Sequence, residues 1–230
     1  LRAFTQWKSS WLSREAILAV LTLILNFFYA VAIIIFDIHI SWFGILCAGF
    51  SLITIFSTSM IYAQMKTVPR WNMSVVPPLF LFYGITGTSI VLNNFFVCSI
   101  LIFVQGTLQI FSWKLGDKKF KEFSHIGTAT GLSQKRNVVR MLEPPHTGSN
   151  YLLKEMVFIV AQKHIHKLRW IALILFAILP FLISAGCVLL QVENFAFLVA
   201  IATINLLGTF VSRWLFFSEA EHVVGLYYDR

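Results

Sequence analysis

The sequence predicts an all-α membrane protein whose helices cross the bilayer several times. Of its 230 residues, 58% are hydrophobic and only 12% are charged, a charged share about half that of a soluble domain. The 23 phenylalanines and 7 tryptophans carry more apolar surface than a water-soluble domain of this size could bury. The composition therefore excludes an ordinary cytosolic enzyme, a disordered chain and a disulfide-framed secreted module.

Charge-free stretches predict six transmembrane helices within one integral membrane domain, residues 1–230. The stretch between Arg70 and Lys114 is about 43 residues long, which suits two spans of roughly 20 residues each. Pro77-Pro78 fits the first turn of one of them, and Asn93-Asn94 fits the tight turn that follows. The expected spans are residues 16–36, 42–65, 75–92, 95–113, 170–190 and 195–217.

Residues 115–167 are more polar, and we expect a basic cytoplasmic loop there. The sequence EPPHTG at residues 143–148 is a clear helix break. After it, Ser149 or Asn150 can cap a helix that runs through Tyr151, Met156 and Ile159 and lies at the membrane surface. The chain then enters the membrane near Arg169-Trp170.

The basic residues lie on one side of the predicted bundle. Every loop lysine and arginine falls in residues 1–15, 66–74 or 114–169 or at the C-terminus, and none in the turns near 37–41, 93–94 and 191–194. Basic loops stay in the cytoplasm, so we expect this basic side to be cytoplasmic. An alternative is that the basic face docks an acidic partner. Either cause explains the net charge of +8 without nucleic acid.

Bound haem, iron–sulfur clusters and zinc are not expected. None of the six histidines lies in the middle of a predicted span, where haem ligands would have to be. Cys47, Cys98 and Cys187 are far apart and form no CxxC pair. We expect these cysteines to be small buried apolar residues.

Ionisable residues are almost absent from the predicted membrane interior, which disfavours a proton-coupled transporter. The deep polar residues are Asn26, Gln105, Gln109 and Asn205. Hydrogen bonding between helices is the favoured role for each of them.

Polar and aromatic residues collect where three predicted spans reach the basic side. Arg2, Ser13 and Glu15 precede the first span. The group at the end of the second span is Tyr62, Gln64, Lys66, Pro69, Arg70 and Trp71. The group at the end of the last span is Arg213, Trp214, Glu219, Glu221 and His222. If these ends meet, they form a pocket for a ligand with a polar ring and an apolar tail. The alternative is an ordinary aromatic belt with a snorkelling arginine.

Three segments carry a resemblance to a known family. They are LRAF and SSWLSRE at residues 1–4 and 9–15, Tyr62 with TVPRW at 67–71 and Pro77, and Gly208 with SRWLFF at 212–217. In order and spacing they resemble the membrane anchor subunit of dimethyl sulfoxide reductase. The similarity extends over the whole chain except the basic loop, which is divergent.

This resemblance implies an eight-helix anchor in the bacterial cytoplasmic membrane, without haem or flavin. Such an anchor holds a molybdopterin catalytic subunit and an iron–sulfur subunit. During anaerobic respiration it oxidises menaquinol and passes the electrons to the iron–sulfur subunit. Against that pattern, a chain beginning at Leu1 lacks the first two helices and a histidine of the quinol site.

The resemblance also implies that Arg2 and Glu15 bind menaquinol, while any role of His222 stays open. The residue chemistry agrees, because quinol oxidation needs a proton acceptor and partners for the ring oxygens. Glu15 is the expected catalytic acceptor, and Arg2 can orient the ring or keep the carboxylate ionised. Ser13 and Arg213 complete the expected quinol-binding set. The alternative role for Glu15 is a surface ion pair with Arg14 or Lys8 at the helix entry.

Two other functions remain open at this level. One is a secondary transporter or channel, against which the scarcity of membrane-interior charge argues. The other is a passive anchor or assembly factor without a quinone site. The terminal electron acceptor would be chosen by a separate catalytic subunit, so this sequence does not name it.

Overall fold

The computed structural model describes residues 2–92, 94–123, 125–133, 135, 138–140, 142–143, 159–192 and 194–223. These residues are helical or in turns, with no strand among them, which confirms the all-α fold class. The helices are α1 (Arg2–Thr5), α2 (Trp11–Phe36), α3 (Ser41–Ala63), α4 (Val76–Val91), α5 (Phe95–Phe123), α6 (Ile126–Thr130), α8 (Ile159–Leu173), a π-helical turn η1 (Ile174–Ile178), α9 (Leu179–Leu190) and α10 (Phe195–Ser218).

Within the described part, five helical stretches are long and apolar enough to cross a membrane, so the chain is a multi-pass membrane protein. They are α2, α3, α5, the continuous stretch His164–Leu190 and α10. The third expected span, α4, is apolar but has only 16 residues. It is therefore about 24 Å long, shorter than the ~30 Å hydrocarbon core.

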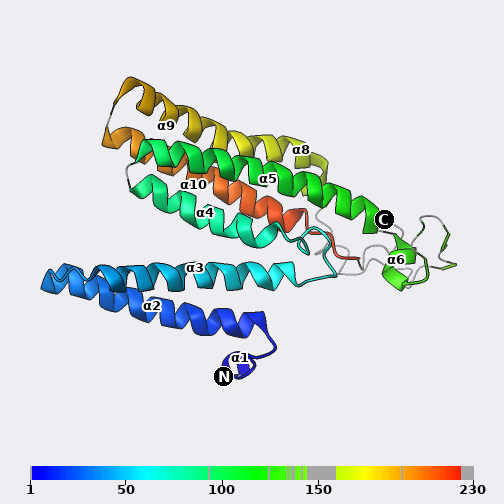
Figure 1. Ribbon diagram of the computed structural model, residues 1–230. Coiled ribbons are helices and arrows are strands. Elements are labelled where there is room, and N and C mark those ends of the chain that lie inside the picture. Colours follow the sequence, from blue (N-terminus) through cyan, green and yellow to red (C-terminus); the bar gives the residue numbers. More distant parts are fainter. Residues whose placement is uncertain are drawn as a thin grey trace.

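Helices α4, α5, α9 and α10 pack together, and the α2–α3 hairpin lies beside them (Figure 1). Helix α3 of this hairpin packs against α4, and at their contact Gly84 of α4 lies against the side chain of Ile55 of α3. The main core lies between α5, η1, α9 and α10 around Phe176, Ile102 and Ile201. Helix α2 buries little of its surface, and its exposed apolar side chains suit contact with lipid.

Short connections join the helices at the end of the bundle opposite the basic side. Asp37 ends α2 in the left-handed conformation, with φ 53°, which closes the last helical turn. The side chains of Asn94 and Asn194 accept hydrogen bonds from the first backbone N–H groups of α5 and α10. Asparagine is a preferred residue at such helix starts, so these turns are encoded locally.

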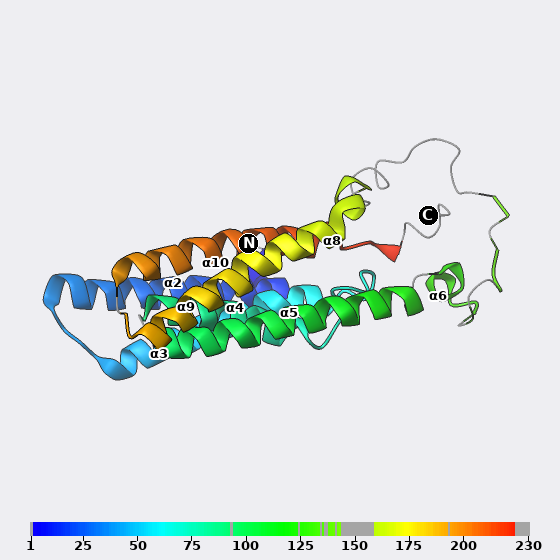
Figure 2. The same ribbon diagram turned by 90° about the horizontal axis from the view of Figure 1, so that it is seen from above.

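A π-helical turn interrupts the long helix that runs from α8 into α9, seen lengthwise in Figure 2. Pro180 follows it and has no N–H to donate to the carbonyl of Phe176 four residues earlier. Asn205 of α10 supplies that donor, since its side-chain nitrogen lies 2.6 Å from the Phe176 oxygen. Asn205 thus makes the helix–helix hydrogen bond that the sequence favours.

Helix α10 meets the same π-helical turn at Gly208. A Cβ atom there would lie 2.2 Å from the backbone nitrogen of Phe176 and 2.6 Å from the backbone carbon of Leu175. We therefore expect Gly208→Ala to destabilise the protein by at least about 2 kcal/mol, because backbone atoms cannot move aside as a side chain can. Thermal unfolding of the purified protein in detergent measures this loss.

The matched control is Gly87→Ala in α4, where nothing lies within 4 Å of the added Cβ. Alanine is favoured over glycine inside a helix, so this variant should unfold at the same temperature or higher. Equal unfolding temperatures for the two variants would mean that α10 does not pack closely against η1.

The beginning of the long polar segment differs from the sequence expectation. The loop was expected from residue 115, but α5 continues as a helix to Phe123. The charged residues 117–122 thus extend the span beyond the apolar stretch instead of ending it, because lysine and glutamate are good helix formers. The expected surface helix after Ser149 or Asn150 falls mainly on residues outside the described part.

Candidate functional site

Glu15 lies in the first turns of α2, facing α3. The hydroxyl of Thr58 on α3 donates a 2.6 Å hydrogen bond to its carboxylate. Arg14 instead donates to the backbone oxygens of Trp7 and Lys8, at 2.8 and 2.7 Å. The alternative of a Glu15–Arg14 ion pair is therefore not what the structure shows, and the carboxylate is held between two helices.

Two other expected quinol-binding residues lie near the start of the chain. Ser13 is 2% exposed, and its hydroxyl has no hydrogen-bond partner among the described residues. A buried hydroxyl without a partner is costly, so this position suits a bound polar group. Arg2 begins the short helix α1, and its side chain lies outside the described part.

An aromatic cluster joins the ends of α3, α4 and α10 with the loop between α3 and α4. Tyr62 is its centre, with ring centroids 5.0 to 5.8 Å from those of four neighbours: Trp71, Phe80, Phe216 and Phe217. Trp71 stacks on Phe216 and also donates its indole N–H to the Phe216 backbone oxygen at 2.9 Å. The rings form an apolar wall at the basic end of the bundle.

The guanidinium of Arg213 is held against this wall. Its central carbon lies 4.5 Å from the ring centroids of Phe80 and Tyr83 and 5.0 Å from that of Phe216. The guanidinium nitrogens Nε and Nη2 are buried and have no partner among the described residues. Arg213 as a whole is half-buried, but a buried donor without a partner is costly, so these two nitrogens suit contact with a polar ligand.

Tyr62 and Thr58 lie on successive turns of α3 and face different helices. The Tyr62 ring contacts Phe216 and Phe217 of α10, and Thr58 donates to Glu15 of α2. The start of α2 and the end of α10 therefore both pack against the end of α3. We call Glu15, Thr58, Tyr62 and Arg213 the ring site, because together they offer a proton acceptor, two hydroxyls and a cation beside aromatic rings.

A buried ion cluster lies at the same end of the bundle, and the sequence did not predict it. Arg169 of α8 donates to Asp117 at 2.7 and 2.9 Å and to Glu219 at 2.7 and 2.8 Å. Arg70 adds a 2.6 Å bond to Asp117 and lies 3.6 Å from Glu219. The cluster ties the α3–α4 loop, α5, α8 and the end of α10 together beside the ring site.

The sequence of the chain is similar to that of a known protein. The chain is similar to a subunit of the sulfite dehydrogenase of Allochromatium vinosum. The two are 26% identical over 264 aligned positions, which cover 99% of this chain and 77% of the relative. No family model matches the chain, and no solved structure matches it. The similarity is to an oxidoreductase subunit, and the dimethyl sulfoxide reductase type stays an expectation.

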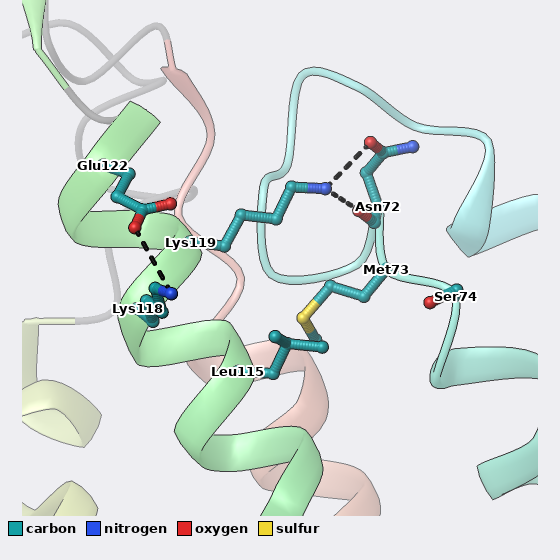
Figure 3. A pocket seen from close by; sticks show the side chains of 7 residues that line it. All are labelled: Asn72, Met73, Ser74, Leu115, Lys118, Lys119 and Glu122. Carbon is teal, nitrogen blue, oxygen red and sulfur yellow. Dashed lines mark hydrogen bonds and ion pairs between the residues drawn. The ribbon is translucent and has the colours of Figure 1, made fainter.

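An open hollow of about 300 Å³ lies on the outer side of the α3–α4 loop, against the end of α5 (Figure 3). Lys119 reaches across it and donates to the backbone oxygen of Asn72 and, at 3.1 Å, to its side-chain oxygen. Lys118 pairs with Glu122 at 3.8 Å. Because both lysines are already engaged, this hollow is a weaker binding site than the ring site.

The cysteines and histidines show no metal-site arrangement in the part of the chain that the structure describes, where no three His, Cys, Asp or Glu residues group together. Cys47, Cys98 and Cys187 are buried and unpaired with one another, as the sequence predicts. His164 and His166 are exposed on α8. His222 lies beyond α10, and burial lowers its pKa below the usual value.

Proposed function

We propose that the chain is the membrane anchor and menaquinol-oxidising subunit of a molybdopterin oxidoreductase complex of the dimethyl sulfoxide reductase type. In this proposal it lies in the bacterial cytoplasmic membrane and passes electrons to an iron–sulfur subunit, which serves the molybdopterin subunit in anaerobic respiration. Menaquinol is its substrate, and no haem, flavin or metal is assigned to the chain. The similarity to a sulfite dehydrogenase subunit supports a place in such a complex.

One observation carries the quinol site: Arg213 lies against an aromatic wall that includes Tyr62, and two of its buried guanidinium nitrogens have no partner among the described residues. A quinol matches this arrangement, because its oxygens need polar partners and its ring and isoprenoid tail need apolar contacts. Arg213 can donate to one ring oxygen, and the Ser13 hydroxyl is a second buried group without a hydrogen-bond partner in the described part of the chain. An apolar wall without such groups would suit only a passive anchor.

In the proposed quinol oxidation, Glu15, Thr58 and Arg213 each have one role. Oxidation of the quinol releases two electrons and two protons, and a positioned carboxylate accelerates the proton transfer. Glu15 accepts the first proton, with Thr58 fixing the carboxylate by its 2.6 Å hydrogen bond. Arg213 stabilises the negative charge that develops on the ring oxygen as the proton leaves.

We expect Glu15→Gln to slow menaquinol oxidation about 100-fold, because an amide keeps the size of the side chain but accepts no proton. Thr58 can still donate to the amide oxygen, so the complex should assemble normally. Turnover with a reduced menaquinol analogue in membranes, together with the yield of intact complex, measures both effects. Glu122→Gln, an exposed carboxylate at the same end of the bundle, is the control and should keep normal turnover. Wild-type turnover in the Glu15 variant would remove Glu15 from the reaction.

A second candidate is the reverse reaction, which the name of the relative favours. A sulfite dehydrogenase takes electrons from its substrate, so a complex of that kind would reduce quinone at the ring site. The same groups serve this direction, with Glu15 returning a proton. Supplying sulfite and an oxidised quinone analogue to the complex distinguishes the directions: quinone reduction under these conditions and no quinol oxidation would select the second.

A further inference from the structure

A line of hydroxyl groups leads away from the ring site. The Tyr83 hydroxyl lies 2.6 Å from the Ser212 hydroxyl and donates a 3.0 Å bond to the side-chain oxygen of Gln109. Ser212 also lies 3.4 Å from that oxygen. Because the central carbon of the Arg213 guanidinium lies 4.5 Å from the Tyr83 ring centroid, the line begins beside the residue proposed to bind the quinol oxygen and ends on α5.

Gln109 is also part of the wall of a small cavity of about 30 Å³. Its other walls come from the α3–α4 loop, α5 and α10, and the polar ones are Arg70, Ser112 and Glu219. A cavity needs roughly 10–15 Å³ and two to four polar partners to hold a water molecule. This cavity meets both conditions, and the Nε atom of Arg70 is buried without a partner among the described residues.

The cavity lies between Gln109 of α5 and the ion cluster at the basic end of the bundle, since both Gln109 and Glu219 line it. Gln109 and Ser112 are buried, whereas Glu219 belongs to the ion cluster, whose other carboxylate, Asp117, is about one third exposed. Hydroxyl groups and bound water can pass a proton along by exchanging hydrogen bonds, but an amide cannot. Gln109 is therefore a positioning residue in this arrangement.

We propose that Tyr83, Ser212 and water held at Gln109 form a proton exit that leads from the ring site to the surface beside Glu219 and Asp117. This inference rests on the proposed function. Each quinol gives two electrons to the iron–sulfur partner, one proton to Glu15 and one proton to this exit. With this exit, the second proton can leave before Glu15 has released the first.

Two variants of the full-length protein in its complex test the exit. Tyr83→Phe keeps the ring beside Arg213 but removes the hydroxyl, and Gln109→Leu removes the group that holds the water. In each, we expect turnover with a menaquinol analogue to fall about tenfold and the solvent deuterium isotope effect to increase. Binding of a fluorescent quinol-site inhibitor should change less than about twofold, because no contact to the ring is lost.

Gln105→Leu is the matched control. Gln105 carries the same buried amide one helical turn away on α5, but it does not line the cavity, so its replacement should leave turnover and isotope effect unchanged. Wild-type turnover in both test variants would overturn the exit. A loss of inhibitor binding in step with turnover would also overturn it, because Tyr83 and Gln109 would then act on the ring directly. Failure of the wild-type protein to bind the inhibitor would refute the ring site itself.

Discussion

Replacing Arg213 with leucine is expected to weaken the binding of a quinol-site inhibitor about 100-fold, which corresponds to the loss of one or two hydrogen bonds to a charged group. Two nitrogens of this guanidinium have no partner among the described residues. They are therefore free to bond to a ring oxygen without first breaking a contact inside the protein. Inhibitor titration with the purified complex measures the change, and quinol turnover should fall in parallel.

The same variant should keep its stability nearly unchanged. Leucine loses the contacts to Phe80, Tyr83 and Phe216, but it also removes a buried charge that no carboxylate in the described part pairs with, and apolar replacements of that kind are often tolerated. Arg213→Lys is the informative companion. It keeps the charge but not the planar fork of donors, so it should restore only part of the binding.

Lys66→Gln controls for the change in net charge, because Lys66 is exposed at the same end of the bundle. It should bind the inhibitor as the wild type does. If Arg213→Leu binds normally but unfolds at a much lower temperature, Arg213 is a structural residue and the ring site lies elsewhere.

Hydropathy and charge predicted the helices and the end of the bundle where the ring-site residues lie, because both properties follow directly from the order of the residues. Glu15 stands at the start of one apolar stretch, and Tyr62 and Arg213 at the ends of two others, so side-by-side packing of the helices brings all three to the same end of the bundle. The expected span 75–92 agrees with α4, Val76–Val91, to within one residue at each end. The pattern did not show α5 continuing to Phe123, since the charges there resemble a loop.

The ion cluster illustrates what the sequence could not show. Asp117 lies 47 residues from Arg70 and 52 from Arg169, so no local spacing joins them. Asp117 stands in a run of charged residues that ordinarily faces water, and Arg169 stands at the start of an expected span, where an arginine ordinarily snorkels. Only the packing of α5, α8 and α10 shows that these charges are buried together.

Replacing Arg169 with methionine is expected to destabilise the protein by about 3–5 kcal/mol, the usual effect of removing one partner from a buried ion pair. Arg169 makes four hydrogen bonds to Asp117 and Glu219, and Glu219 is 5% exposed. Without Arg169, only Arg70 remains beside two carboxylates. Thermal unfolding in detergent measures the loss, and the end of α10 that carries Arg213 should also become mobile.

A double variant separates charge from packing in this cluster. Adding Glu219→Gln to Arg169→Met removes the carboxylate that lost its partner, so it should recover part of the stability. Lys118→Met is the matched control, because its pair with Glu122 is exposed and 3.8 Å long and should contribute less than about 1 kcal/mol. Equal losses for Lys118→Met and Arg169→Met would mean that the cluster is not buried. No recovery in the double variant would mean that Arg169 acts through its packing against Trp113. The end of α10 would then be held by packing and not by charge.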